Sequence, residues 1–246
     1  MPIGDTSFQV RAMQFEIYRS MTNEQRLLIA FEMTMFAREL SKAGIRRDHP
    51  DWSETQVVRE LLRREVFSRI TAALDQAGIA YMLTGSFASA YYGAPRTTQD
   101  IDLVVSASAD QLRSLAHLLP SDTYYVDLDA TLQANRHESM FNVLDLVTGW
   151  KIDFIIRKSR AFSMEEFQRR TPIAVEGIQV FAATPEDLIV SKLEWAKPCR
   201  SYWHIEDVAG ILKLRWSSLN RNYLEKWIGE LQLRTQWDDA RQAADV

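Results

Sequence analysis

The chain has 246 residues, 46% of them hydrophobic, and a formal net charge of −4 at neutral pH. This length allows one large domain or two small ones with real cores, and the negative charge argues against broad, nonspecific nucleic-acid binding by the whole surface. There is no run of about 18 apolar residues, and the N-terminus has neither the basic nor the apolar region of a signal peptide. A single cysteine, Cys199, excludes an internal disulfide. We therefore expect a soluble cytoplasmic protein without a membrane segment.

Residues 1–67 are predicted to form an N-terminal helical region. Thr22 and Gln25 have the capping-box spacing that starts a helix, and Ser53 and Gln56 repeat this spacing for a second helix. Apolar residues follow each cap at helical intervals. The two helices thus share a hydrophobic side, which we expect to pack within the chain, with docking of a partner as the alternative.

Residues 68–183 are predicted to form an α+β core in which helices flank a mixed β-sheet. The expected strands are residues 79–83, 100–105, 123–128, 141–147, 151–156, 171–175 and 178–182. Capping patterns predict helices that open at Ser108 and at Ser163. Residues 184–246 are predicted to be a C-terminal helical region, whose first helix has its cap at Thr184 and a proline at its first position.

Two aspartates mark the start of the second predicted strand. Asp100 and Asp102 are separated by one residue, so the two-residue period of a strand places both carboxylates on the same face. Such a pair is most readily tolerated around a divalent cation. Upstream, Gly85 and Ser86 lie at a turn between a strand and a helix, where backbone N–H groups are free to bind phosphate. The combination predicts a metal-dependent nucleotide site.

A two-metal site needs a third carboxylate from a neighbouring strand. Asp153 interrupts an otherwise apolar strand, where a buried carboxylate without a cation would be costly, so we favour it as the third ligand. For Asp145, the other acid of the predicted hairpin, we favour a plain strand-edge position in water.

The pattern of Gly85-Ser86 followed by Asp100-Ile-Asp102 resembles the nucleotidyltransferase superfamily of the polymerase-beta-like type. The run from Tyr92 to Asp102 is similar to bacterial members related to the toxin component of abortive-infection toxin–antitoxin systems. The likeness extends from about Ile70 to the C-terminus, where Thr184-Pro-Glu-Asp-Leu is followed by Lys192 and Asp207. The N-terminal helices lie outside it.

The resemblance implies two Mg²⁺ ions, with Mn²⁺ as an alternative, and a nucleoside triphosphate. Asp100 and Asp102 would then bind both ions, and Asp153 the ion that activates the acceptor. Gly85 and Ser86 would hold the β and γ phosphates, Arg96 could reach the triphosphate or be a plain surface arginine, and Lys192 is a further phosphate contact. For Asp207 we expect a structural role, through pairing with Lys192.

Three functions remain open on the sequence. The first is a metal-dependent nucleotidyltransferase that moves a nucleotide to a hydroxyl of RNA, such as a tRNA end, or of protein, as a component of a toxin–antitoxin pair. The second is a regulator of the same fold that binds a nucleotide or an antitoxin-like partner protein without catalysis. The third is nucleotidylation of a small molecule of the aminoglycoside kind. The three aspartates Asp100, Asp102 and Asp153 favour catalysis.

Overall fold

The computed structural model describes residues 15–39, 67–96, 98, 100–146, 149–175, 178–199 and 202–246. The chain divides into two compact units. The helical unit comprises the described residues up to Ile29, the segment Ser89–Pro95 and the segment Pro185–Val246. The sheet unit comprises the described residues of Ala30–Ala88 and of Arg96–Thr184. Each unit has a hydrophobic core of its own.

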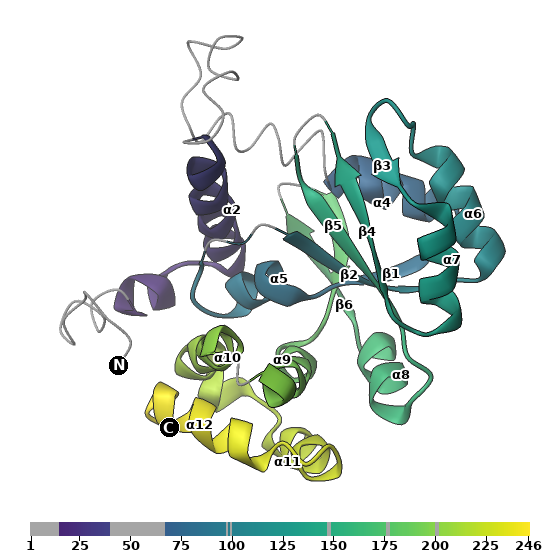
Figure 1. The fold of residues 1–246 in the computed structure, drawn as a ribbon. Coiled ribbons are helices and arrows are strands. Elements are labelled where there is room, and N and C mark those ends of the chain that lie inside the picture. The colour runs from purple at the N-terminus through teal and green to yellow at the C-terminus, as the bar shows by residue number, and fades with distance from the viewer. Residues whose placement is uncertain are drawn as a thin grey trace. The chain divides into compact units, whose positions relative to one another are not determined.

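A seven-stranded sheet forms the centre of the sheet unit, with the strand order β3-β4-β5-β2-β1-β7-β6 (Figure 1). The strands are β1 (Ala80–Leu83), β2 (Asp100–Ser106), β3 (Tyr124–Val126), β4 (Met140–Asp145), β5 (Lys151–Ile156), β6 (Thr171–Val175) and β7 (Ile178–Ala182). The β2–β5 and β1–β7 pairs are parallel, and the other pairs are antiparallel. The predicted α+β fold with a mixed sheet is confirmed.

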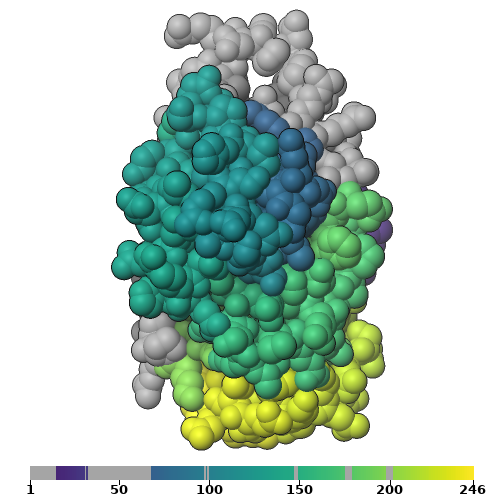
Figure 2. Space-filling view, turned by 90° about the vertical axis from the view of Figure 1, so that its right-hand side faces the viewer, coloured from purple at the N-terminus to yellow at the C-terminus, as the bar shows by residue number. Residues whose placement is uncertain are grey.

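Helices cover one side of this sheet. They include α4 (Phe67–Gln76), α6 (Ala109–Leu118) and α7 (Leu128–Arg136), which lie together beside the strands (Figure 1). Figure 2 looks onto this layer, with α4 in blue next to the teal surface of α6 and α7. Two more helices, α5 (Gly85–Tyr92) and α8 (Ala161–Gln168), follow β1 and β5 directly.

The central strand β2 separates a buried face of the sheet from an accessible one. Ile101, Leu103 and Val105 are buried, whereas Asp100 and Asp102, which alternate with them, are partly exposed. The period of two along a strand produces this alternation. On the buried face, neighbouring strands interlock through apolar side chains, of which the stacked rings of Phe141 and Phe154 are an example. The accessible face is left for the polar residues.

The described residues of the helical unit form helices and no strand. These helices are a segment at residues 15–20, the start of α2 (Asn23–Glu39), the end of α5 from residue 89, α9 (Pro185–Cys199), α10 (Tyr202–Arg215), the short η2 (Trp216–Ser218), α11 (Arg221–Glu230) and α12 (Arg234–Ala244). The predicted capping box of α2 is confirmed, because Gln25 N–H donates to Thr22 Oγ1 and Thr22 N–H to Gln25 Oε1. The second predicted N-terminal helix, at Ser53, lies outside the described residues. Within the part of the chain that the structure describes, no helix is both long and apolar enough to span a bilayer.

Several predicted boundaries are wrong. The strand expected at 141–147, for example, is β4 (Met140–Asp145). Helix α8 begins at Ala161, two residues before the expected cap Ser163, whose hydroxyl instead accepts a hydrogen bond from Arg160 Nε at 3.0 Å. Strand β3 ends at Val126, because the Asp127 side chain accepts a hydrogen bond from Ala130 N–H and caps α7 there. The error in β3 comes from a side-chain cap that the hydrophobic pattern does not show, whereas α8 starts without any side-chain cap.

Candidate active site on the sheet

Three aspartates lie on the accessible face of two neighbouring strands. Strands β2 and β5 run parallel, with Asp100 opposite Lys151 and Asp102 opposite Asp153. Since directly opposed residues of paired strands point to the same side, the carboxylates of Asp100, Asp102 and Asp153 share one face. The Asp153 residue is only 5% exposed, whereas about a third of the Asp100 side chain, 35%, is accessible. The strands that carry the acids, β2 and β5, are neighbours near the centre of the sheet (Figure 1).

A lysine ammonium lies between two of these carboxylates. Lys151 Nζ is 3.2 Å from Asp100 Oδ1 and 2.9 Å from Asp153 Oδ2. The other oxygen of Asp153, Oδ1, accepts a hydrogen bond of 2.6 Å from the Asn142 side-chain amide on β4. Both oxygens of Asp153 are therefore engaged from adjacent positions of the sheet.

Burial and the neighbouring charges both shift the pKa values of Asp153 and Lys151. Burial raises the pKa of Asp153, and the charge of Asp100 adds to the rise, which outweighs the lowering by Lys151 and Asn142. Burial alone would lower the pKa of Lys151, but its hydrogen bonds to Asp153 and Asp100 and their charges raise it. The Asp153 carboxylate is thus a group that depends on a nearby positive charge to remain ionised.

The turn before α5 is shaped by Asp102. Gly85, the first residue of α5, has a φ of +66°, a region that side-chain-bearing residues rarely adopt. A Cβ atom at Gly85 would overlap the Asp102 carboxylate. The backbone also ties the turn to the strand, because Thr84 N–H donates to the Asp102 carbonyl oxygen at 3.0 Å. Glycine at this position is what allows the helix start to approach the acid.

Two further predicted residues meet at the same turn. Arg96 Nη2 donates a hydrogen bond of 2.6 Å to Ser86 Oγ, which belongs to a largely buried residue in the first turn of α5. The interaction places a guanidinium at the helix start, where the partial positive charge of the helix end also lies. Gly85, Ser86, Arg96 and the aspartates are therefore brought together within the sheet unit.

Lys192 belongs to the helical unit, and its ammonium has a local partner. Lys192 on α9 lies 2.5 Å from Asp207 on α10, and both residues are buried. The expected structural pairing of Asp207 with Lys192 is thus present. Contact of Lys192 with a nucleotide stays a prediction.

The expectation for Asp145 was wrong. We expected a strand-edge acid in water, but the residue is 0% exposed at the end of β4. The alternation of β4 places Asp145 on the same side as buried Phe141 and Val143, the opposite side from Asn142. It therefore lies on the other face of the sheet from Asp153.

The donor chemistry of the site fits a divalent cation, although the carboxylates are not gathered around one point. Hard cations such as Mg²⁺ take oxygen ligands, and three carboxylates face the same side here. Lys151 shows that a positive charge is accommodated between Asp100 and Asp153. Among the described residues, no group of three acidic, histidine or cysteine side chains is close enough together to hold a metal ion as it stands.

Sequence reasoning missed Lys151 and Asn142. Lys151 lies two residues before Asp153, so the period of two that placed Asp100 beside Asp102 also places the lysine on the acid face. Asn142 needed the register of the β4–β5 hairpin, which pairs it with Asp153. The spacing of Lys151 and Asp153 can be seen in the sequence, whereas the pairing of Asn142 with Asp153 depends on the position of the turn between β4 and β5.

Comparison with known proteins gives one family match and several similar folds. Residues 19–78 match the family described as Rv0078B-related antitoxin. This segment covers less than half of the chain and includes α2 and α4. No curated protein matches the sequence.

Among solved structures, ANT(2'')-Ia in complex with adenylyl-2''-tobramycin has a TM-score of 0.45 at 17% identity, over 68% of this chain and 95% of that one. A nucleotidyltransferase-like antigen from Paracoccidioides brasiliensis has a TM-score of 0.36 at 18% identity, over 72% and 91%. JHP933 from Helicobacter pylori has a TM-score of 0.41 at 16% identity, over 79% and 92%. Scores at this level decide nothing about function, which depends on this chain's own residues.

Proposed function

We propose that the protein is a metal-dependent nucleotidyltransferase, which moves a nucleoside monophosphate from a nucleoside triphosphate to an acceptor hydroxyl. The observation that carries the proposal is the register of β2 and β5, which puts Asp100, Asp102 and Asp153 on one accessible face. The turn at Gly85 comes against Asp102 on the same unit. A phosphate-binding turn beside three carboxylates is the arrangement that transfer of a nucleotide requires.

The residues divide into two groups by the part of the reaction they would serve. Asp100 and Asp102 would hold two Mg²⁺ ions, and Asp153 would hold the one nearer the acceptor. These ions would supply the positive charge that stabilises the pentavalent phosphorus and its flanking oxygens. Ser86 Oγ and Arg96 would bind the triphosphate as a hydrogen-bonding pair at the start of α5.

In the reaction, the acceptor oxygen forms a bond to the α-phosphorus while the bond from that phosphorus to the bridging oxygen breaks. Pyrophosphate leaves with the electron pair of the broken bond. The hydroxyl proton passes to a carboxylate on the acid face.

A transfer assay tests the proposal. The full chain is incubated with each of four labelled nucleotides, ATP, CTP, GTP and UTP, and with total RNA, protein or aminoglycosides as acceptors. We expect label to appear in one acceptor class with Mg²⁺ and to fall by at least about a hundredfold in Asp100→Ala, because metal ligands are needed in the transition state. The matched control is Asp129→Asn, which removes a carboxylate from the exposed start of α7 and should leave transfer unchanged. Absence of transfer to every acceptor class, with nucleotide still bound, would instead support a binding module.

The family match favours a second function for the N-terminal part. Residues 19–78 resemble an antitoxin family, so we propose that the protein is one component of a toxin–antitoxin pair and binds its partner protein. This differs from the resemblance of residues 92–102, which is to the toxin side of such systems. The two resemblances agree on the kind of system and differ on the role.

Co-expression distinguishes the two roles. The product of a neighbouring gene is expressed alone and with the full chain, and growth is measured. Rescue of growth by both the natural chain and Asp100→Ala supports an antitoxin that acts by binding. Rescue that is lost in Asp100→Ala supports an antitoxin that acts by nucleotide transfer. Growth inhibition by the chain alone, relieved by its neighbour, supports a toxin.

A further inference from the structure

The positive charge between Asp100 and Asp153 comes from the chain itself. Lys151 Nζ contacts both carboxylates, at 3.2 and 2.9 Å. Building on the proposed function, we propose that Lys151 is an internal counter-ion. It holds the cation position between these aspartates in the metal-free protein and must leave that position before a divalent cation binds.

The sheet fixes this arrangement. Lys151 is directly opposite Asp100 across the β2–β5 pair and two residues before Asp153 on the same strand. Its side chain therefore starts on the acid face, on the same side of the sheet as both carboxylates. No loop has to close to bring the ammonium into place.

The metal-free protein needs such a charge. Three carboxylates on one face repel one another, and the Asp153 side chain is only 8% exposed. A buried carboxylate without a positive partner would favour its neutral form or destabilise the fold. Lys151 lets the chain fold with the acids ionised before a metal ion is bound.

The Lys151 ammonium can also move away from the two carboxylates. Its side chain is 34% exposed, so the ammonium has a route to water. Lysine carries a compact, strongly hydrated charge on a flexible stem, and its pair with the partly exposed Asp100 is of the weak kind. The backbones of Asp100 and Asp153, in contrast, are held in place by the pairing of their strands.

The proposal accounts for the spacing of the acids. Within the described part of the chain, no three acidic groups are gathered closely enough for a metal ion. An ammonium inserted between Asp100 and Asp153 holds their oxygens apart. Release of Lys151 would allow the carboxylates to converge.

Manganese binding to the full chain tests this, by titration calorimetry or by the electron paramagnetic resonance of free Mn²⁺, without any substrate. We expect Lys151→Met to bind Mn²⁺ about tenfold more tightly than the natural protein, because an ammonium no longer competes for the two carboxylates. The control Lys158→Met removes the same charge from an exposed position just after β5 and should leave the affinity unchanged.

Equal or weaker Mn²⁺ binding by Lys151→Met would overturn the counter-ion role alone, since the metal site would still exist. Failure of both the natural chain and Lys151→Met to bind Mn²⁺ would overturn this inference together with the metal-dependent reaction. Circular dichroism checks that Lys151→Met folds. If Lys151→Met does not fold, the variant Lys151→Arg is tested in its place. The arginine guanidinium binds a carboxylate through two N–H groups and competes better with the metal ion, so we expect it to weaken Mn²⁺ binding several-fold. Unchanged or tighter Mn²⁺ binding by Lys151→Arg would overturn the counter-ion role.

Discussion

Gly85 is the residue on which the candidate site depends most directly. Its φ of +66° and the closeness of Asp102 are two independent reasons for glycine here. The missing side chain allows a helix start and a carboxylate to occupy adjoining space. A phosphate bound at this turn would thus lie beside the acids of the sheet.

We predict that Gly85→Ala destabilises the protein by about 2 kcal/mol or more, because the Cβ meets the Asp102 carboxylate and alanine is strained at positive φ. The measurement is urea unfolding followed by circular dichroism. Gly229 in α11 is the matched control, since a Cβ there has nothing within 4 Å. Gly229→Ala should leave stability unchanged or raise it by up to about 1 kcal/mol, because alanine favours helix. Equal effects of the two substitutions would contradict the role assigned to Gly85.

The site residues whose positions could be predicted from the sequence are those that belong to a local pattern within one strand or one turn. Asp100 and Asp102 follow from the period of two within one strand, and Gly85 from a turn between a strand and a helix. The position of Asp153 opposite Asp102 required a guess about which strands are neighbours. Burial of Asp145 could not be predicted, because it depends on which face of β4 the helices cover.

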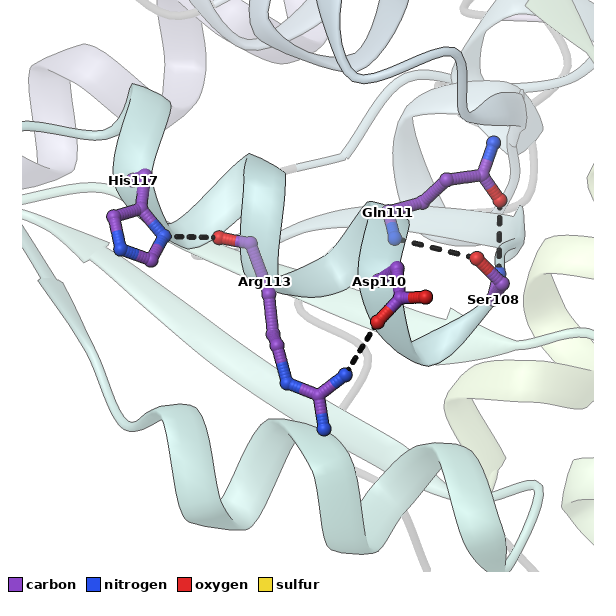
Figure 3. Close-up of polar contacts among 5 residues, drawn as sticks. All are labelled: Ser108, Asp110, Gln111, Arg113 and His117. Carbon is purple, nitrogen blue, oxygen red and sulfur yellow. Dashed lines mark hydrogen bonds and ion pairs between the residues drawn. The ribbon is translucent and has the colours of Figure 1, made fainter.

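At the scale of elements, side-chain caps decide where helices start. Helix α6 has a complete capping box, in which Gln111 N–H donates to Ser108 Oγ at 3.2 Å and Ser108 N–H to Gln111 Oε1 at 2.9 Å (Figure 3). The Gln111 amide also donates to the Gly78 carbonyl oxygen, at the turn after α4. The same figure shows an ion pair on the exposed side of α6, between Arg113 and Asp110.

These two contacts of α6 should differ in their effect on stability. Ser108→Ala is expected to cost about 1 kcal/mol, because it leaves N–H groups of the first turn without their side-chain acceptor. Arg113→Gln breaks the ion pair but should cost less than about 0.5 kcal/mol, because its partners are 49% and 93% exposed and water screens them. Urea unfolding measures both. A larger loss for Arg113→Gln than for Ser108→Ala would show that the cap does not hold this helix.

Three strands were predicted with their correct bounds. The strand Lys151–Ile156 and the hairpin strands Thr171–Val175 and Ile178–Ala182 have the expected bounds. Helix α8 was misplaced because its start has no side-chain cap, so that Ser163 provided a false signal two residues later. A residue of the cap type therefore does not by itself mark where a helix starts.

At the scale of the whole molecule, the chain passes between two units, and each has its own polar interactions. The acids of the candidate site belong to the sheet unit, whereas Lys192 and Asp207 form a buried pair in the helical unit. A second buried contact of that unit joins Tyr223 on α11 to Asp187 on α9. These contacts connect α9 to α10 and to α11.

Tryptophan fluorescence can distinguish unfolding of the helical unit from unfolding of the sheet unit. Five of the seven tryptophans lie in the helical unit, at positions 195, 203, 216, 227 and 237. Unfolding followed by tryptophan fluorescence therefore reports mainly on that unit. Binding of Mn²⁺ to Asp100, Asp102 and Asp153 would report on the sheet unit.

We predict that Lys192→Met lowers the stability seen by fluorescence by about 3 kcal/mol or more, because Asp207 stays buried without its lysine. The double variant Lys192→Met with Asp207→Leu should recover most of the loss, since replacing both charges by apolar groups removes the penalty. Binding of Mn²⁺ and of a nucleotide to the folded double variant should match the natural protein if the pair serves the helical unit alone. Loss of nucleotide binding with Mn²⁺ binding intact would instead establish Lys192 as a phosphate contact.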